Sequence, residues 1–257
     1  MNAIILRITR LKDSDAIVDW LTDTDVIMTT YAARVQTSKA YPNGLEPLCV
    51  YEIEHTRRPH QDMGRLTSAL CVERFEALTS DMQAYACACA ALEAIGNLCP
   101  NDTLVFELFS SLLATLAVMN TAPDLALMAL TWLECFLMHQ LGTLPNLEMC
   151  AQCARNLEQS TWFQQELGFL CATCAHTQTN IPAFVLSGIR RLRYQSLRTT
   201  VQNALNKGDE QSRLRILMPM LKLFMAIMCD NSSLTRLKAH RFVLETYEMP
   251  ASKGAMP

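Results

Sequence analysis

The sequence predicts an α+β protein, in which a small β-barrel or sandwich precedes an all-helical domain that carries a four-cysteine zinc knuckle. Three observations lead to this prediction. Apolar residues alternate with period 2 up to about residue 75 and recur at helical spacing from about residue 82. Two Cys-x-x-Cys pairs, at positions 150–153 and 171–174, lie within the helical part. The chain has 257 residues, of which 50% are hydrophobic, so it is long enough to bury a sizeable core.

The segment 1–80 contains five candidate strands. Their apolar residues alternate or are β-branched, and turns rich in Asp, Asn, Gly and Ser separate them. The candidates are residues 4–8, 16–20, 26–31, 49–53 and 66–72. These strands leave no room for crossover helices, so we expect a closed barrel or a sandwich rather than a doubly wound sheet. We assign residues 1–80 to the barrel and residues 81–257 to the helical domain, with the zinc-binding insertion at 145–180.

Helices are expected from Ser80 or Asp81 onward. The N-cap candidates and the apolar periodicity predict helices that cover residues 81–98, 101–119, 122–141 and 209–228, and another that opens at 181–182. Gly142 and Pro145 stop the third of these helices. Apolar residues cover most of the surface of the first three, as is typical of the central helices of a bundle.

The charge is unevenly distributed, although the formal net charge is only −3. Residues 81–149 contain seven acidic residues and no Lys or Arg, whereas residues 181–257 contain twelve basic and five acidic residues. The basic last third indicates an anionic partner, and we expect the acidic middle to lie away from phosphates.

Several function classes have no motif in this sequence. The eight glycines are too widely spaced for a G-x-G-x-x-G or a P-loop, and protease, esterase and kinase signatures are absent. We therefore expect a protein that is not an enzyme. The 11 cysteines form no even disulfide set, no signal peptide is recognisable, and the uncharged apolar stretch at residues 108–123 is too short to span a bilayer. These features predict a cytoplasmic protein with no membrane partner.

The strongest motif consists of Cys150, Cys153, Cys171 and Cys174. Each Cys-x-x-Cys pair places two sulfur atoms on one tight turn, so the four can occupy the corners of a tetrahedron. The motif predicts one structural Zn²⁺, because four protein ligands leave no open position for water. His176 is a nearby competing ligand, and four buried free thiols or an iron–sulfur or redox site are the alternatives. We expect the remaining seven cysteines to fill the core.

Several segments of the chain, including residues 13–22 and 234–239, resemble one protein family. The run from Phe136 to Cys153 resembles a helix ending in Leu-Gly-x-x-Pro-x-Leu-x-x-Cys, and residues 168–174 resemble the second cysteine pair of the same family. Residues 33–39 are similar to its basic loop, although Val35 and Gln36 stand where that loop has a second basic residue. The family is that of the RecO recombination mediators of bacterial DNA repair.

The resemblance implies an OB-fold for the barrel. It also implies a role in DNA repair and recombination: binding single-stranded DNA, annealing complementary strands, and loading RecA together with RecR onto strands coated by single-stranded-DNA-binding protein (SSB). The implied partners are single- and double-stranded DNA, RecR and the C-terminal tail of SSB. The implied location is the bacterial cytoplasm, in association with the nucleoid.

The basic side chains form two candidate sets of nucleic-acid contacts. The barrel set is Arg34, Lys39, Arg57, Arg58 and Arg65. The second set lies within about two and a half helical turns and comprises Arg190, Arg191, Arg193 and Arg198. Candidate stacking residues in the barrel are Trp20, Tyr31, Tyr41 and Tyr51, of which we expect half or more to be core.

One alternative function belongs to a different class. The chain can be a zinc-stabilised protein-interaction module that does not bind nucleic acid, and the net negative charge favours this alternative slightly. Salt-dependent binding to single-stranded DNA distinguishes the two.

Overall fold

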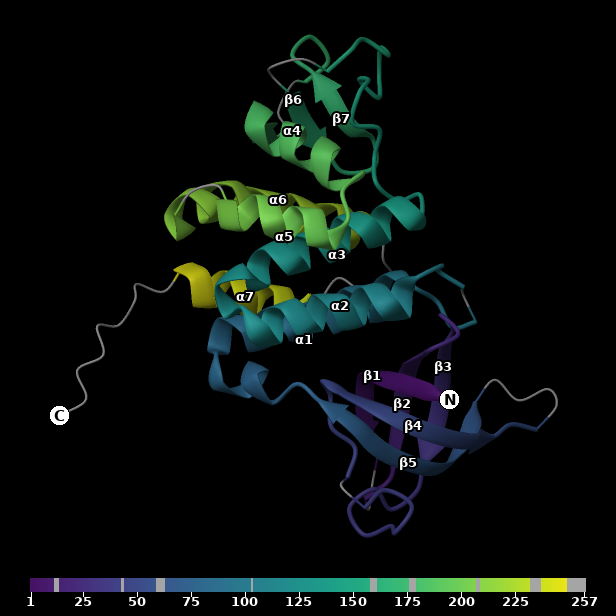
Figure 1. Cartoon of the computed structure of the whole chain (residues 1–257). Helices are drawn as coiled ribbons and strands as arrows, with labels where there is room; N and C mark the ends of the chain where they lie inside the picture. Colours follow the sequence, from purple (N-terminus) through teal and green to yellow (C-terminus); the bar gives the residue numbers. More distant parts are fainter. Residues whose placement is uncertain are drawn as a thin grey trace. The chain divides into compact units, whose positions relative to one another are not determined.

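The computed structural model describes residues 1–11, 14–42, 44–58, 63–102, 104–157, 161–175, 179–206, 209–231 and 237–248. The chain forms two compact units (Figure 1). Unit 1 comprises Met1–Ala126 together with the chain from Lys238 onward, and unit 2 comprises Leu127–Leu237. Unit 2 is therefore inserted into unit 1 along the sequence.

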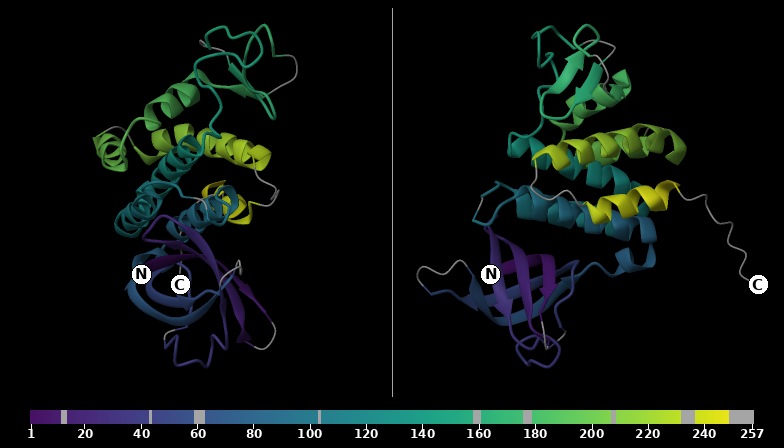
Figure 2. Two further views of the ribbon diagram at one scale, coloured as in Figure 1. Left: turned by 90° about the vertical axis from the view of Figure 1, so that its right-hand side faces the viewer. Right: turned by 180° about the vertical axis from the view of Figure 1, so that it is seen from behind.

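Unit 1 begins with a closed five-stranded barrel, which Figure 2 shows in two further views. Its strands are β1 (Asn2–Arg10), β2 (Ala16–Thr22), β3 (Ile27–Ala32), β4 (Cys49–Thr56) and β5 (Gly64–Arg74). They are paired in the order β1-β2-β3-β5-β4, and β1 also pairs with β4 to close the barrel. β3 and β5 run parallel and every other pair is antiparallel. This five-stranded closed topology is that of the OB-fold, and all five predicted strands are confirmed.

The first part of strand β1, residues 3–6, is buried on both faces. Ala3 and Ile5 point into the barrel core, in which Trp20 and Tyr51 are the largest side chains. Ile4 and Leu6 are also buried, because helix α1 (Met82–Leu98) packs against the outside of β1. The helix follows a short 3₁₀ segment at Glu76–Ser80 and begins as predicted, with the Asp81 carboxylate accepting a hydrogen bond from Ala84 N at 2.8 Å.

The second helix starts later than the sequence predicts. Helix α2 spans Leu108–Thr121, so the expected cap at Asn101 or Asp102 is wrong. Asp102 and Glu107 both have positive φ, which is incompatible with a continuing helix. The carboxylate that caps α2 comes instead from Asp25 in the β2–β3 turn, and it accepts hydrogen bonds from Glu107 N (2.8 Å) and Phe109 N (2.7 Å).

The last described helix of the chain lies beside the first. Helix α7 (Lys238–Glu248) packs against α1, and Figure 1 shows the two side by side although the whole of unit 2 separates them in the sequence. Gln83 Nε2 donates to Thr246 O at 3.3 Å near one end of the contact. The sequence pattern alone does not predict α7.

Unit 2 contains helices before and after a small cysteine-bearing sheet in the sequence. A 3₁₀ turn at Pro123–Leu125 leads into α3 (Ala126–Gln140), and the sheet β7-β6-β8 follows, formed by Thr161–Gln164 (β6), Gly168–Cys171 (β7) and Thr179–Ile181 (β8). The helices α4 (Ala183–Leu192), α5 (Leu197–Asn206) and α6 (Glu210–Asn231) complete the unit. The predictions of α3, α4 and α6 are confirmed, whereas α5 and the three short strands were not predicted.

Candidate metal centre and nucleic-acid surfaces

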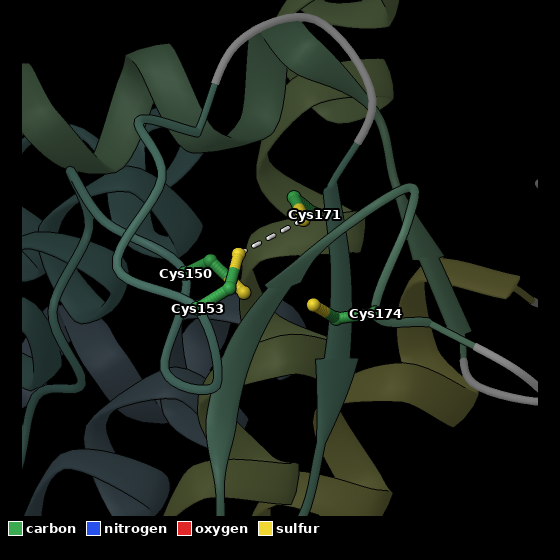
Figure 3. A group of neighbouring side chains, drawn as sticks. All are labelled: Cys150, Cys153, Cys171 and Cys174. Atoms are coloured by element: carbon green, nitrogen blue, oxygen red, sulfur yellow. Dashed lines mark hydrogen bonds between the residues drawn. The ribbon is translucent and has the colours of Figure 1, made fainter.

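The four predicted metal ligands lie together at one end of the small sheet. Figure 3 shows Cys150 and Cys153 on one turn, facing Cys171 at the end of β7 and Cys174 on the next turn. All four Sγ atoms lie within 4.8 Å of one another, and the Sγ atoms of Cys153 and Cys171 are 3.6 Å apart. A tetrahedral ion with metal–sulfur distances of about 2.3 Å requires sulfurs about 3.8 Å apart, so the cluster can hold a metal ion.

Backbone hydrogen bonds form the two turns that carry the sulfurs. Ala154 N donates to Cys150 O at 2.9 Å in the first turn, and Cys174 N donates to Cys171 O at 3.0 Å in the second. Ala151 N donates to Phe169 O at 2.9 Å and so joins the first turn to β7. Gly168 begins β7 with φ +103, a conformation that side-chain-bearing residues rarely adopt.

Backbone hydrogen bonds favour ionisation of two of the four thiols, Cys150 and Cys171, whereas a hydrogen bond with the Cys153 side chain and burial raise the pKa of Cys174 to about 12. Burial by itself raises the pKa of Cys150, but hydrogen bonds from the backbone of Cys171, Cys153 and Gln152 outweigh it and lower the pKa to about 6. Burial likewise acts to raise the pKa of Cys171, and hydrogen bonds led by that of the Cys174 backbone lower it overall. Because the thiolate is the form that binds metals, these amides favour the ligand state.

Two arginines of the predicted DNA-binding set fasten the cysteine segment to α4. Arg190 donates to Leu147 O from Nη2 at 2.6 Å and to Leu157 O at 3.0 Å, and its Nε lies 3.2 Å from a Glu148 carboxylate oxygen. Arg193 Nη2 lies 3.3 Å from the other Glu148 oxygen. Arg190 and Arg193 therefore have structural partners, which the spacing of basic residues did not reveal.

The other two arginines of that set are exposed. Arg191 lies at the end of α4 and Arg198 in the first turn of α5, and neither forms an ion pair within the described part of the chain. The structure thus divides the four arginines into Arg190 and Arg193, which have partners within the fold, and Arg191 and Arg198, which are exposed.

OB-folds bind nucleic acids on the face of strands 2 and 3 and on the loops between strands 1 and 2 and strands 4 and 5, and part of the barrel set lies on or beside these elements. Arg57 and Arg58 follow β4 in the last of these loops, and Arg65 pairs with Tyr31 in the β3–β5 ladder. Arg34 and Lys39 lie in the segment after β3. All five side chains are exposed, and Arg57 forms an ion pair of 3.6 Å with Asp102.

A hydrogen-bonded group orients the segment after β3. Asp15 accepts a hydrogen bond from the Tyr31 hydroxyl and another, of 2.7 Å, from Arg34 N. These bonds, first that of Tyr31, hold the pKa of Asp15 below its ordinary value, and the nearby Arg34 and Arg65 charges add to the effect. Arg34 adopts φ +51, so the segment turns sharply at this residue.

Three of the four candidate stacking residues of the barrel are core residues. Trp20, Tyr41 and Tyr51 are buried, and Trp20 Nε1 donates to Thr30 Oγ1 at 2.8 Å inside the barrel. Only Tyr31 is partly exposed, on the outer face beside Arg65. The barrel therefore offers one aromatic ring of this group to a ligand.

Of the seven remaining cysteines, Cys49, Cys87, Cys99 and Cys135 are buried, as expected of core residues, whereas Cys71, Cys89 and Cys229 are only partly buried. Cys99 and Cys135 are buried, and burial raises the pKa of each to about 12, so neither is a nucleophile at neutral pH. His176, the competing metal ligand, lies outside the described residues. Among the described residues, no helix has both the length and the apolar character needed to cross a bilayer.

Comparison with known proteins identifies the family. The sequence pattern described as "Recombination protein O C terminal" matches residues 79–218, more than half of the chain. This chain belongs to the RecO family. The match spans the acidic helices, the complete cysteine cluster and α4 and α5, so the family assignment includes the candidate metal centre.

Curated relatives carry the name of the same family. A protein of Dehalococcoides mccartyi (strain ATCC BAA-2266 / KCTC 15142 / 195), named DNA repair protein RecO, is 29% identical over 196 residues, which are 75% of this chain and 76% of the relative. DNA repair protein RecO of Anaeromyxobacter dehalogenans (strain 2CP-C) is 29% identical over 178 residues, 68% of this chain and 70% of the relative. That of Roseiflexus sp. (strain RS-1) is 32% identical over 133 residues, 50% of this chain and 46% of the relative.

Proposed function

We propose that this protein acts in DNA repair and recombination by binding single-stranded DNA and annealing complementary strands. Membership of the RecO family is the observation that carries the proposal. The relatives that match most of the chain are named as DNA repair proteins. None of the proposed steps breaks a covalent bond, so the protein needs no catalytic residues.

We also propose that the cysteine cluster binds one Zn²⁺ with a structural role. A set of four thiolates favours zinc, and a complete protein shell leaves no position for a reacting water. The ligands are Cys150, Cys153, Cys171 and Cys174. The ion holds together two turns that otherwise rest on a three-stranded sheet of only three or four residues per strand.

The proposed path of the DNA crosses the part of the barrel that carries its exposed basic side chains. Arg34, Lys39, Arg57, Arg58 and Arg65 supply phosphate contacts, and Tyr31 supplies an aromatic surface between them. OB-folds commonly bind single strands with this combination of cations and exposed aromatic rings. In unit 2, the exposed Arg191 and Arg198 are the stronger candidates for contacts, because Arg190 and Arg193 are engaged within the fold.

We propose the mediator role on the basis of the same family assignment. The protein would bind RecR and the C-terminal tail of SSB, and would help RecA to replace SSB on single strands. It would also bind duplex DNA. We place this activity in the bacterial cytoplasm, at the nucleoid.

Fluorescence anisotropy with an unstructured single strand at several salt concentrations tests the proposal. Log K should fall linearly with log salt, with a slope of about −0.7 for each phosphate contacted. The triple variant Arg34→Asn, Lys39→Gln, Arg65→Gln should reduce the slope by up to about 2 units and slow the annealing of complementary strands. Asn is chosen at Arg34 because it tolerates positive φ. Arg241→Gln, at an exposed position on α7, is the control and should bind as the wild type does.

An absence of binding even at about 50 mM salt would refute the proposal. The protein-interaction module would then be the better description of the chain. Unchanged binding and annealing in the triple variant, with wild-type binding intact, would remove the barrel from the DNA path.

A further inference from the structure

The turn between α4 and α5 presents one aromatic ring to solvent. Tyr194 is 74% exposed, the largest exposed fraction among the large hydrophobic residues described. Its backbone is held firmly: Tyr194 N donates to Arg191 O at 3.2 Å, and the next residue, Gln195, accepts a hydrogen bond of 2.8 Å from Trp132 Nε1 on α3. An aromatic ring held out on a fixed turn is typical of a contact site.

Two side chains, Arg193 and His139, contact the Tyr194 ring. The guanidinium carbon of Arg193 lies 4.4 Å from the centre of the Tyr194 ring, a stacked cation–π arrangement. Arg193 is in turn paired with Glu148 of the cysteine segment, and only 18% of its side chain is exposed. The His139 ring meets Tyr194 at 89°, with centroids 6.4 Å apart. One side of the ring is thus supported by the protein, and most of the residue remains open to solvent.

A hollow of about 520 Å³ lies beside this ring. Tyr194, His139 and Arg193 line it together with two amide side chains, Asn146 and Asn156, with the Glu148 carboxylate that pairs with Arg193, and with apolar residues. The Asn146 Oδ1 atom is used by the backbone N–H groups of Glu148 and Met149, which leaves its NH₂ group for other contacts. The hollow therefore has room and hydrogen-bonding groups for the polar edge of a base whose face lies on the ring, whichever base that is.

Cations flank the ring along the chain. Arg191 precedes Tyr194 by three residues and Arg198 follows it by four, and both are exposed. The first turn of α5 also lies here, where Ser196 accepts a hydrogen bond from Thr199 N at its N-terminus. Aromatic rings between exposed cations are typical of surfaces that bind single strands without sequence preference.

We propose that Tyr194 is a stacking platform for one unpaired base of single-stranded DNA, with Arg191 and Arg198 contacting the neighbouring phosphates. This inference rests on the proposed function and adds to it a binding residue outside the barrel. Arg193 acts as a positioning residue, since it holds the platform and is itself held by the cysteine segment through Glu148. The contact is to the face of the base, so it should tolerate any sequence.

Variants of Tyr194 in the full chain test the proposal, with anisotropy measured on the same unstructured strand across a range of salt concentrations. Tyr194→Ala should weaken binding about fivefold or more, because base–aromatic stacking contributes at that level. The slope of log K against log salt should stay unchanged, because no charge is removed. Tyr194→Phe retains the ring and should bind within about twofold of the wild type. Arg191→Gln should instead reduce the slope by about 0.7.

A strand in which abasic sites replace the bases supplies the matched ligand control. The wild type should bind this strand less tightly than the normal one, and Tyr194→Ala should cause little further loss on it, because the stacking partner is already missing. The metal content and thermal midpoint of each variant establish that the cysteine segment is intact.

The outcomes separate this inference from the function on which it rests. Wild-type binding with normal salt dependence, together with unchanged affinity in Tyr194→Ala, overturns the platform and leaves DNA binding in place. Equal losses in Tyr194→Ala and Tyr194→Phe overturn stacking in favour of the hydroxyl. An equal loss on normal and abasic strands also overturns stacking. An absence of wild-type binding overturns the proposed function itself.

Discussion

Glu93 on α1 holds His240 on α7 by a hydrogen bond of 2.7 Å between a carboxylate oxygen and Nδ1. The same carboxylate accepts bonds from the backbone N–H groups of Ala239 and His240, so it caps the first turn of α7. His240 is fully buried and the Glu93 side chain is 17% exposed. One acidic side chain thus joins two helices that the whole of unit 2 separates in the sequence.

Replacing this carboxylate should weaken the contact between the two helices. We expect Glu93→Gln to lower the free energy of unfolding by about 1–3 kcal/mol, since the amide retains part of the bonding but loses the charge. Denaturant unfolding measures the change, and Glu54→Gln, at an exposed position of β4, is the control that should change it little. A loss no larger than that of the control would mean that α7 is held by its apolar contacts alone.

Acid should have the same effect as the substitution. Burial raises the pKa of Glu93, but hydrogen bonds from His240 and the Ala239 amide outweigh it, so the folded-state pKa lies below the ordinary value of 4.5. The unfolded chain therefore binds the proton more readily. The contribution of Glu93 is complete above the unfolded-state pKa and is lost as the pH falls through the folded-state pKa. The difference in stability between the wild type and Glu93→Gln should shrink over that range, and a constant difference would contradict this account.

The cysteine cluster predicts a defined metal content. We expect one zinc per chain by elemental analysis, falling to well under half in Cys153→Ser, whereas Cys229→Ser on α6 should retain it. Removing the metal with a chelator should increase hydrogen exchange first in the described parts of residues 145–180, because the remaining unit has its own helical core. Protein that is purified without metal loss and contains almost no zinc would contradict the assignment.

A substitution at Gly168 tests the four-cysteine segment without changing any of the four cysteines. Its φ is +103, and an added Cβ would lie 3.2 Å from Pro145 Cβ. Gly168→Ala should therefore strain β7 and reduce zinc retention, with a stability cost of about 1–3 kcal/mol. Gly142→Ala, which also has positive φ but an open Cβ position, is the matched control and should retain zinc fully. Equal zinc retention in the two variants would mean that the contact with Pro145 does not matter.

The ion pair between Arg57 and Asp102 predicts a gain in binding. Asp102→Asn removes from Arg57 an ion-pair partner 3.6 Å away, and it removes a negative charge beside the proposed DNA path. This position of Asp102 differs from the expectation that the whole acidic middle of the chain lies away from phosphates. Asn suits the φ of +61 at this position, so the fold should be kept. We expect the affinity for a single strand to rise by up to about fivefold at low salt, and the gain to vanish at high salt. A loss of affinity would place Asp102, and not Arg57, among the contacts.

The helix cap provided by Asp25 is a separate stability test within unit 1. Asp25→Ala removes the acceptor for Glu107 N and Phe109 N and also places alanine at a φ of +61. Thermal unfolding should show a loss of about 1–2 kcal/mol, whereas Asp25→Asn should lose less, because asparagine caps helices and tolerates this φ. Equal losses in the two variants would point to the charge rather than the cap.

The elements that could be predicted are those whose signals are local. The alternation of apolar residues predicts the five barrel strands, and the position of Asp81 before an apolar run predicts that it caps a helix. The spacing of the cysteines predicts their cluster. The cap of α2 could not be predicted, because its acceptor, Asp25, lies far earlier in the chain, on a turn of the barrel. Helix α7 and strands β6–β8 are short and gain their stability from partners elsewhere in the chain, so their own residues give a weak signal.

The same limit applies to the candidate site. Spacing alone placed Arg190, Arg191, Arg193 and Arg198 on one basic surface, but it contains no information on which side of α4 faces the cysteine segment. Tyr194 lay within this run and was not selected as a stacking residue, although its position between two arginines was a usable signal. The division of the chain at residue 80 and the identity of the DNA contacts stay predictions.

The position of α7 has a consequence for synthesis on the ribosome. The face of α1 that α7 covers cannot be covered until the whole of unit 2 has left the exit tunnel. At roughly 5–20 residues per second, synthesis of a segment as long as unit 2 takes on the order of 5–20 s. Unit 2 can fold during this time, whereas unit 1 still lacks its last helix. A nascent chain that stalls before Lys238 would present an uncovered α1 to chaperones and proteases, so only chains translated beyond this point complete the first unit.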